Sequence, residues 1–148
     1  MNAAEVFVDT NVFLYAIDDD PASSAKRQTA RNLLLSVRWG WSVQVAAEFF
    51  VNATSPKRPF RLADADAAAL IETWLAYPTL PTAPDLVRAA IVLRRSFQLN
   101  YWDAAILAAA KQLGCHTVYS EDLNHGQEYD GVRVVNPFLA ATAPATPA

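Results

Sequence analysis

Two aspartates follow apolar runs that are typical of buried strands, a position where side chains can act on a ligand. Asp9 ends the run 6–8, and Asp122 comes shortly after the run 117–119. Short, continuously apolar runs indicate parallel strands covered on both faces. In open sheets of this kind, ligands bind beyond the carboxyl ends of the strands. We therefore expect both carboxylates at one binding edge, with Ser120 close enough to orient a water or a phosphate.

Two further acids lie in expected helices. Glu48 is the only charged residue of the apolar stretch 43–51, and it shares a narrow polar stripe with Gln44 and Asn52 at a spacing of four residues. A helix this apolar is packed on most sides, so its polar edge is expected to border a cleft. Asp103 stands at the head of the apolar stripe of another helix. These two acids can converge with the first two on one edge of one sheet.

Each acid also has a simpler role, which the sequence leaves open. Asp9 can be a turn residue before a capped helix, and Asp103 can complete a capping box with Asn100. The polar stripe of Glu48 can face bulk water, and Asp122 can be an ordinary loop acid. The hypothesis of one shared site therefore rests on their joint placement, not on any acid taken singly.

Four gathered carboxylates predict a site for a hard divalent cation, Mg²⁺ or Mn²⁺, because such ions prefer oxygen ligands. Without the ion, two charges 4 Å apart repel by about 4 kcal/mol at an effective dielectric near 20. At least one carboxylate should then stay protonated until the metal binds. A bound ion would lower the pKa of its water, orient a phosphate and stabilise the charge of the reaction. All four acids are thus both candidate ligands and candidate catalytic residues.

Other kinds of site find little support. His116 and His125 are isolated, so no Ser-His or Cys-His nucleophile pair stands out, and Cys115 is the only cysteine. With four glycines there is no phosphate-binding glycine loop. The acidic run 18–20 precedes a proline and is typical of a solvated turn.

The net charge of −3 and the pI near 5.2 exclude nucleic-acid binding through overall positive charge. Bound cations can offset the acids locally. Six of the twelve basic residues fall in two short stretches, 57–61 and 88–95, that either meet a phosphate backbone or form solvated faces. Aromatic residues could stack on bases, although core packing is the more frequent role; they are Trp39, Trp41, Tyr77 and Tyr101.

The pattern of elements predicts an α/β fold in which strands alternate with helices and a parallel sheet is covered on both faces. The expected strands are 6–8, 39–43, 79–80, 116–119 and 132–135. The expected helices are 12–17, 23–37, 45–53, 62–76, 84–97 and 101–113.

The length of 148 residues fits one domain, for which we expect residues 1–139, followed by a disordered Ala/Thr/Pro tail at 140–148. No secretory signal and no membrane-spanning run is apparent, so a cytoplasmic location is expected.

Four segments resemble the signature segments of the PIN-domain ribonucleases, in the order found in that family. They are VFVDTNV around Asp9 and Asn11, QVAAEFF around Glu48, YWDAAI around Asp103, and SEDLNHG around Ser120 and Asp122. The closing VVNPF is similar too. The resemblance covers residues 5–138, and within the family the length and the closing segment resemble the VapC toxins of toxin–antitoxin pairs.

The resemblance implies a three-layer α/β/α fold with a parallel sheet of about five strands, and cleavage of RNA that depends on Mg²⁺ or Mn²⁺. It implies Asp9 and Asp103 as first metal ligands, completed by Glu48 and Asp122 and supported by Asn11 and Ser120. It also implies a homodimer, a small VapB-type antitoxin that blocks the cleft, and a structured tRNA or rRNA as substrate.

Two rival hypotheses remain. A non-catalytic PIN-like module would bind RNA or protein without cutting, and the intact set of acids argues against it. A receiver-like or aspartyl-phosphate phosphatase domain also gathers acids at strand ends. The phosphatase would need an aspartate where Asn11 stands, and a receiver would need a lysine at a late strand end.

Overall fold

Strand β1 lies in the middle of a six-stranded sheet with the order β3-β2-β1-β4-β6-β5. We describe a computed structural model of the chain for residues 3–139. Five strands are mutually parallel, and β5 pairs antiparallel with β6 at one edge. The strands are β1 (Val6–Val8), β2 (Trp39–Ser42), β3 (Thr79–Leu80), β4 (Thr117–Tyr119), β5 (Glu128–Tyr129) and β6 (Val132–Val135).

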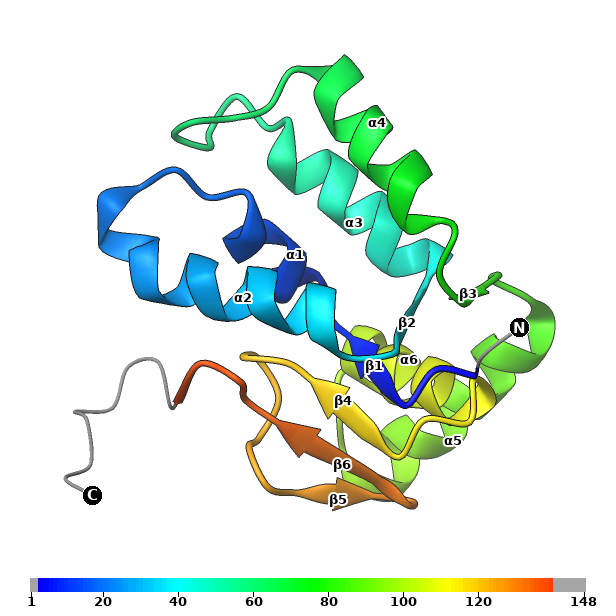
Figure 1. Cartoon of the computed structure of the whole chain (residues 1–148). Coiled ribbons are helices and arrows are strands. Elements are labelled where there is room, and N and C mark those ends of the chain that lie inside the picture. Colours follow the sequence, from blue (N-terminus) through cyan, green and yellow to red (C-terminus); the bar gives the residue numbers. More distant parts are fainter. Residues whose placement is uncertain (1–2, 140–148) are drawn as a thin grey trace, which may run out of the picture.

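Helices cover both faces of the sheet, as the parallel pairing requires. Helices α1 to α4 gather on one side, and α5 and α6 pack together on the other (Figure 1). They are α1 (Thr10–Ala16), α2 (Ser24–Ser36), α3 (Val43–Ala53), α4 (Asp64–Trp74), α5 (Pro84–Phe97) and α6 (Tyr101–Gln112), with a 3₁₀ turn η1 (Pro21–Ser23) before α2. The expected three-layer α/β/α architecture is confirmed.

The chain changes direction across the sheet between β1 and β4. From β1 it moves outward to β2 and β3, and it then returns to place β4 on the other side of β1. Phe7 pairs with Gly40 of β2 and with Val118 of β4. The carboxyl ends of β1 and β4 therefore flank the topological switch point, where open α/β sheets bind ligands.

Aromatic side chains fill the core beneath α1. Phe13 of α1 contacts the rings of Trp39 and Trp41 from β2 and the ring of Trp74 from α4 at centroid distances of 4.9–5.2 Å. Both β2 tryptophans are fully buried, and their indole N–H groups donate to the Leu34 carbonyl and the Thr79 hydroxyl. The sequence-based preference for core packing over base stacking is correct for these two residues.

The expected elements agree with the structure except at a few boundaries. The sixth strand, β5, was not expected; it forms through a two-residue hairpin in which Asp130 and Gly131 both have positive φ. Val43 begins α3 instead of ending β2. Helix α1 begins at Thr10, two residues before the expected start of the helix 12–17, and Asp9 is its cap. The expected disordered tail, 140–148, lies outside the described residues.

Within residues 3–139, no helix is long and apolar enough to cross a membrane.

Candidate active site

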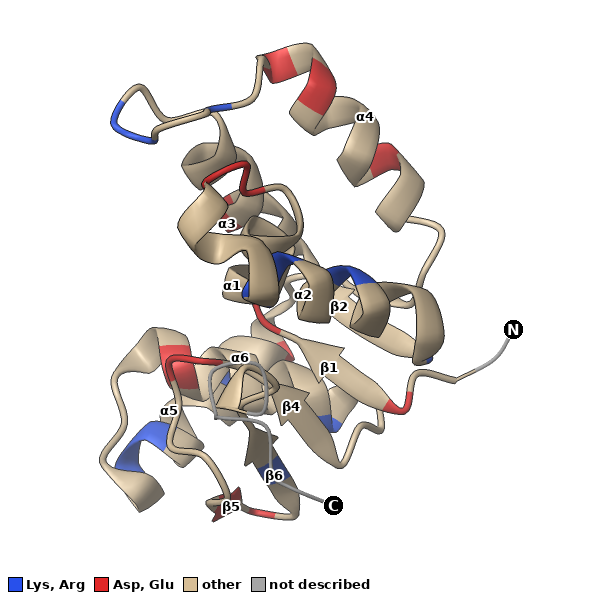
Figure 2. Cartoon of the chain, turned by 60° about the vertical axis from the view of Figure 1, so that its left-hand side comes forward, with Lys and Arg blue, Asp and Glu red and all other residues tan. Residues whose placement is uncertain are grey.

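Asp9 lies directly after β1, where it both caps α1 and faces the switch point. Its side chain is 7% exposed. Its Oδ1 accepts a hydrogen bond of 2.7 Å from the backbone N–H of Thr10, and its Oδ2 accepts one of 2.7 Å from the hydroxyl of Ser120. Ser120 follows β4 and is completely buried. The ends of the two neighbouring strands are thus joined through this carboxylate, at the position in Figure 2 where β1 leads into α1.

Glu48 reaches the same place from α3. Its Oε2 accepts a hydrogen bond of 2.9 Å from the Thr10 hydroxyl, and its Oε1 accepts one of 2.9 Å from Gln44. The polar stripe of α3 therefore points toward the residue that follows Asp9, where Glu48 is half-buried and bonded within the protein. Asn52, at the far end of the stripe, bonds back to the Glu48 carbonyl.

Asp122 is held beside the first turn of α1. Asn11 donates to Asp122 Oδ2 at 3.2 Å and accepts from the backbone N–H of Glu121 at 3.2 Å. The backbone N–H of Asp122 in turn donates to the Ser120 hydroxyl at 3.1 Å. One serine and one asparagine thereby tie the segment after β4 to the segment after β1. Both residues were expected as supporting residues from the resemblance.

Asp103 enters from α6, the helix on the opposite face of the sheet. Asn100 caps this helix by accepting from the Asp103 N–H at 2.9 Å, and its side-chain amide donates to Asp103 Oδ2 at 2.8 Å. Asn100 is therefore the cap, and Asp103 accepts from its side-chain amide, whereas the capping box that the sequence left open would use the backbone N–H of Asn100. Its pKa is raised by burial first and then by the negative charges of Asp122 and Glu48. The negative charges of Asp122 and Glu48 thus act on Asp103, while its hydrogen bonds are made to Asn100.

The electrostatic cost of the arrangement falls mainly on Asp9. The pKa of Asp9 is raised from 3.8 to about 6 as the net result of several effects: burial raises it most, the hydrogen bonds from Ser120 and Thr10 lower it, and the negative charges of Asp122 and Glu48 raise it. Desolvation and like charge both favour the protonated acid. A divalent cation would reverse both effects, because it supplies positive charge to the buried carboxylate.

The donor set suits a hard cation in its chemistry, since it consists of carboxylate oxygens with amide and hydroxyl neighbours. The distances between these side chains, however, do not yet form a metal site. Within residues 3–139, no three or more His, Cys, Asp or Glu side chains stand close enough together to hold a metal ion as they are. The acids lie near enough to raise the pKa of Asp9 and Asp103, and the side chains would have to draw inward around an ion.

Some contacts of the site were not found from the sequence. Thr10 links two of the acids, because its backbone N–H donates to Asp9 and its hydroxyl donates to Glu48. Lys26 and Glu121 form an ion pair of 2.7 Å, and the Tyr15 hydroxyl donates to Glu121 at 2.8 Å and accepts from Lys26 at 3.1 Å. The position of Thr10 next to Asp9 was a usable signal. The Lys26–Glu121 pair joins residues 95 positions apart, and no local sequence pattern indicated it.

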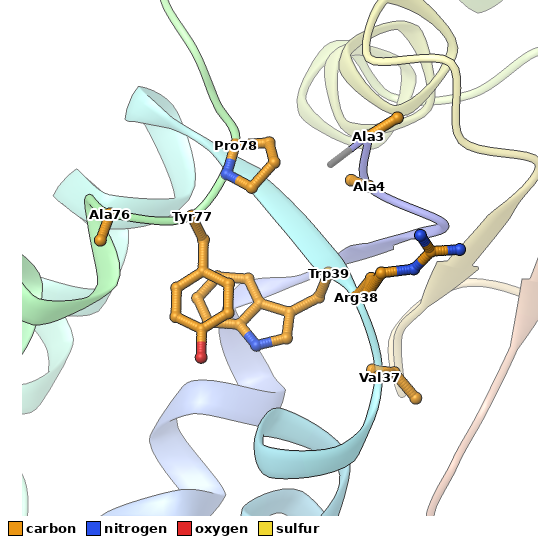
Figure 3. Close-up of a pocket in the computed structure, with 8 residues that line it drawn as sticks. All are labelled: Ala3, Ala4, Val37, Arg38, Trp39, Ala76, Tyr77 and Pro78. Atoms are coloured by element: carbon orange, nitrogen blue, oxygen red, sulfur yellow. The ribbon is translucent and has the colours of Figure 1, made fainter. Parts of the chain in front are cut away.

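A separate hollow of about 240 Å³ lies at the opposite edge of the sheet, near the amino ends of β1 and β2. Figure 3 shows Tyr77 lying over the ring of Trp39, with the ring centroids 3.9 Å apart. Arg38, at its rim, is paired with Glu5. None of the four acids lines this hollow, so it is not part of the candidate site.

The fold and the site place the protein in a class of three-layer α/β domains that carry carboxylates at the switch point of a parallel sheet. Residues 6–127 match the family described as PIN domain. The chain belongs to the PIN-domain family. No curated protein sequence matches it.

Solved structures share the fold at low sequence identity. VapC20 of Mycobacterium tuberculosis, described as a sarcin-ricin loop cleaving toxin, is 22% identical, with 79% of this chain and 89% of that chain covered and a TM-score of 0.61. A toxin–antitoxin complex from Klebsiella pneumoniae is 18% identical, with 89% of this chain and 97% of that chain covered and a TM-score of 0.64. A DNA-bound VapBC from Salmonella typhimurium is 19% identical, with 88% of this chain and 96% of that chain covered and a TM-score of 0.62.

Proposed function

We propose that this protein is a metal-dependent endoribonuclease that hydrolyses RNA phosphodiester bonds at the carboxylate cluster. The observation that carries the proposal is the pairing of Asp9 with Ser120 at the switch point, with Glu48 and Asp122 close enough to raise its pKa. Membership of the PIN-domain family supports it. Asp9 is buried and is repelled by the neighbouring acids, which is costly to the fold, and a bound cation would offset that cost.

In this proposal, Asp9 and Asp103 bind Mg²⁺ or Mn²⁺ first, and Glu48 and Asp122 complete the site. The ion would supply an activated water and positive charge for the phosphate oxygens. The chain itself orients the ligands. Ser120 holds one oxygen of Asp9 and leaves its charge directed at the switch point.

The other supporting residues act on the remaining acids. Thr10 and Gln44 fix both oxygens of Glu48, so this carboxylate can turn only as far as the two donors allow. Asn11 holds Asp122 from α1. Protonated Asp9 would have to lose its proton before it binds the ion, so metal binding would release a proton.

We further propose that the protein is the toxin of a VapBC-type pair. The similar folds are those of a toxin that cleaves the sarcin-ricin loop and of toxins in complexes with their antitoxins. A small VapB-type antitoxin would cover the carboxylate cleft, a homodimer would be the active form, and a structured tRNA or rRNA in the cytoplasm would be the substrate.

Incubation of the pure protein with cellular RNA and Mn²⁺ tests the proposal. We expect cleavage that stops in EDTA and falls at least a hundredfold in Asp9→Asn and Asp103→Asn, while Asp85→Asn, an exposed acid on α5, cuts normally. Mapping the cut ends would identify the substrate, and co-expression of the neighbouring gene would test neutralisation. Binding of RNA without any metal-dependent cleavage would favour the non-catalytic PIN-like module instead.

A further inference from the structure

A pocket of about 220 Å³ runs along the exposed face of α1, beside the carboxylate cluster. Its lining residues Asn11, Leu14, Tyr15 and Asp18 are spaced three, four and seven residues apart, so they form one stripe of the helix and its end. Arg58 closes the pocket from the segment between α3 and α4, which carries basic residues in Figure 2. Asn11 also donates to Asp122, so the pocket and the cluster share a residue.

The pocket has rigid walls. The Tyr15 hydroxyl is held by Glu121 and Lys26, and its ring packs edge-on against Phe138 at 4.7 Å. Arg58 donates to the Leu14 carbonyl at 3.2 Å, which places its guanidinium over the end of α1. A volume near 220 Å³ exceeds that of one water several times and is smaller than a drug-sized site, so it suits one planar group the size of a nucleobase.

The pocket has two charged groups: the guanidinium of Arg58, which is a positively charged donor, and the carboxylate of Asp18, which is a negatively charged acceptor. Within residues 3–139, no carboxylate lies at ion-pair distance from Arg58, and the Leu14 carbonyl is the one acceptor recorded for its five N–H groups. The carboxylate of Asp18 accepts one bond, from the backbone N–H of Asp20, and its backbone carbonyl accepts one from Arg27. Asp18 was expected only as part of a solvated turn, yet it lines the pocket. A carboxylate here would repel a phosphate and accept from the N–H groups of a base.

We propose that this pocket is a nucleobase subsite that selects guanine next to the bond that is cut. Guanine offers two acceptors, O6 and N7, to an arginine, and its N1–H and N2–H₂ groups are donors for a carboxylate. Arg58 and Asp18 present these complementary groups in one pocket. Bases that are unstacked from single-stranded RNA are read in this way, by stacking and by their edges. The inference rests on the proposed ribonuclease function.

The distance along α1 agrees with an adjacent nucleotide. Leu14 comes five residues after Asp9, which corresponds to about 7.5 Å along a helix axis. A phosphodiester bound at Asp9 therefore has its neighbouring base at the level of Leu14 and Arg58. Asn11 lies between the two positions and can contact the connecting sugar-phosphate.

Cleavage of a randomised pool of short RNA oligonucleotides with Mn²⁺, followed by sequencing of the ends, tests the subsite. The wild-type protein should enrich guanine at one position next to the cut. Arg58→Ala should lower kcat/KM about tenfold or more and lose the enrichment. Asp18→Asn should lose the preference for guanine. Lys57→Ala, which removes the same charge from the neighbouring exposed position, should change neither.

Thermal unfolding of each variant shows whether the loss comes from the fold, and Arg58→Lys keeps the charge if Arg58→Ala is unstable. Enrichment that is unchanged in Arg58→Ala, or a wild-type protein with no base preference beside the cut, would overturn the subsite.

A binding measurement separates this inference from the proposed function. In metal-free buffer, titration with GMP, AMP, CMP or UMP can be followed through the NMR signals of the Asn11 side-chain amide and the Arg58 Nε–H. GMP should give the largest shifts, and Asp18→Asn should abolish that difference. Guanine-selective shifts in a protein that cuts no RNA would retain the subsite and reject the nuclease. Signals unmoved by all four nucleotides would reject the subsite even if the protein cuts RNA.

Discussion

At the scale of single residues, Asp9 is subject to opposing forces. Two short hydrogen bonds favour its carboxylate form, whereas burial and two nearby acids favour the protonated form and raise the pKa to about 6. Since one pKa unit corresponds to about 1.4 kcal/mol, ionised Asp9 costs the metal-free fold about 3 kcal/mol. A positive charge bound next to Asp9 would offset this cost and thereby stabilise the folded protein.

The metal-free protein should therefore lose stability as the pH rises from about 4 to above 6. Between the pKa values of the unfolded and folded states, the folded protein binds the extra proton, so the free energy of unfolding falls with pH and then levels off. Urea unfolding in EDTA across this range measures the slope. Asp9→Asn should flatten it and be the more stable protein at pH 7.5, whereas Asp19→Asn, at an exposed position, should behave as wild type. A wild-type stability that rises through this interval would contradict the assignment.

The element on which each of the four acids lies could be predicted from the sequence, and the contacts of the acids could not. Asp9 and Asp122 were located by the rule for strand ends, and Glu48 by its isolation in an apolar helix. The bridge through Thr10 depends on the angle at which α3 crosses α1, which no local pattern records. The same holds for the electrostatic coupling of Asp103 to acids on the other face of the sheet.

At the scale of elements, the segment after β4 is fixed at three successive residues. Ser120 bonds to Asp9, Glu121 to Tyr15 and Lys26, and Asp122 to Asn11. The ion pair of Lys26 with Glu121 ties this segment to α2, where it touches none of the four acids directly. Lys26 therefore acts on the site through the placement of Asp122.

Lys26→Met should weaken the response to metal more than it weakens the fold. With Glu121 released, Asp122 has fewer restraints, so the Mn²⁺ concentration for half-maximal cleavage should rise about tenfold while KM for RNA changes little. Metal titrations of cleavage measure this. Lys26→Arg should restore part of the effect, and Arg88→Met, which breaks an exposed pair on α5, should leave it unaltered. A uniform loss of rate at every metal concentration would assign Lys26 a purely structural role.

Strand β2 passes close to its neighbours at Gly40. A methyl group there would meet the Ala4 Cβ at 2.9 Å and the Pro78 carbonyl at 3.1 Å. Gly40→Ala should therefore destabilise the protein by about 1–3 kcal/mol, the usual cost of overpacking. The urea midpoint measures the change. An unaltered midpoint would mean that the backbone at Ala4 yields without cost.

Most elements were predictable because each carries its own pattern of apolar residues and caps. Strand β5 has two residues, too few for a periodic pattern, and was missed. Its signal was the Asp130-Gly131 pair, a favoured two-residue hairpin turn whose two central residues have positive φ, as the structure shows. The residues of the turn could therefore have predicted this strand, whereas the pattern of apolar residues could not.

At the scale of the whole molecule, a cation should couple the site to global stability. An ion that binds only the folded protein stabilises it by about 2.7 kcal/mol at a hundred times its Kd. Mn²⁺ should therefore raise the melting temperature of the wild type at pH 7.5, and should do so much less for Asp9→Asn and Asp103→Asn. Asp85→Asn serves as the control, since its side chain is exposed on α5. Equal shifts in all variants would indicate binding elsewhere.

The bond between Asp9 and Ser120 joins residues 111 positions apart, on neighbouring strands. At about 5–20 residues per second of synthesis, Ser120 is made roughly 6–22 s after Asp9. Glu48 and Asp103 are made in that interval as well, so all three acids precede the residue that holds Asp9 in place. Each new copy of the protein therefore leaves this edge of the sheet unassembled at first, and the last fifth of the sequence determines when the bond between Asp9 and Ser120 can form.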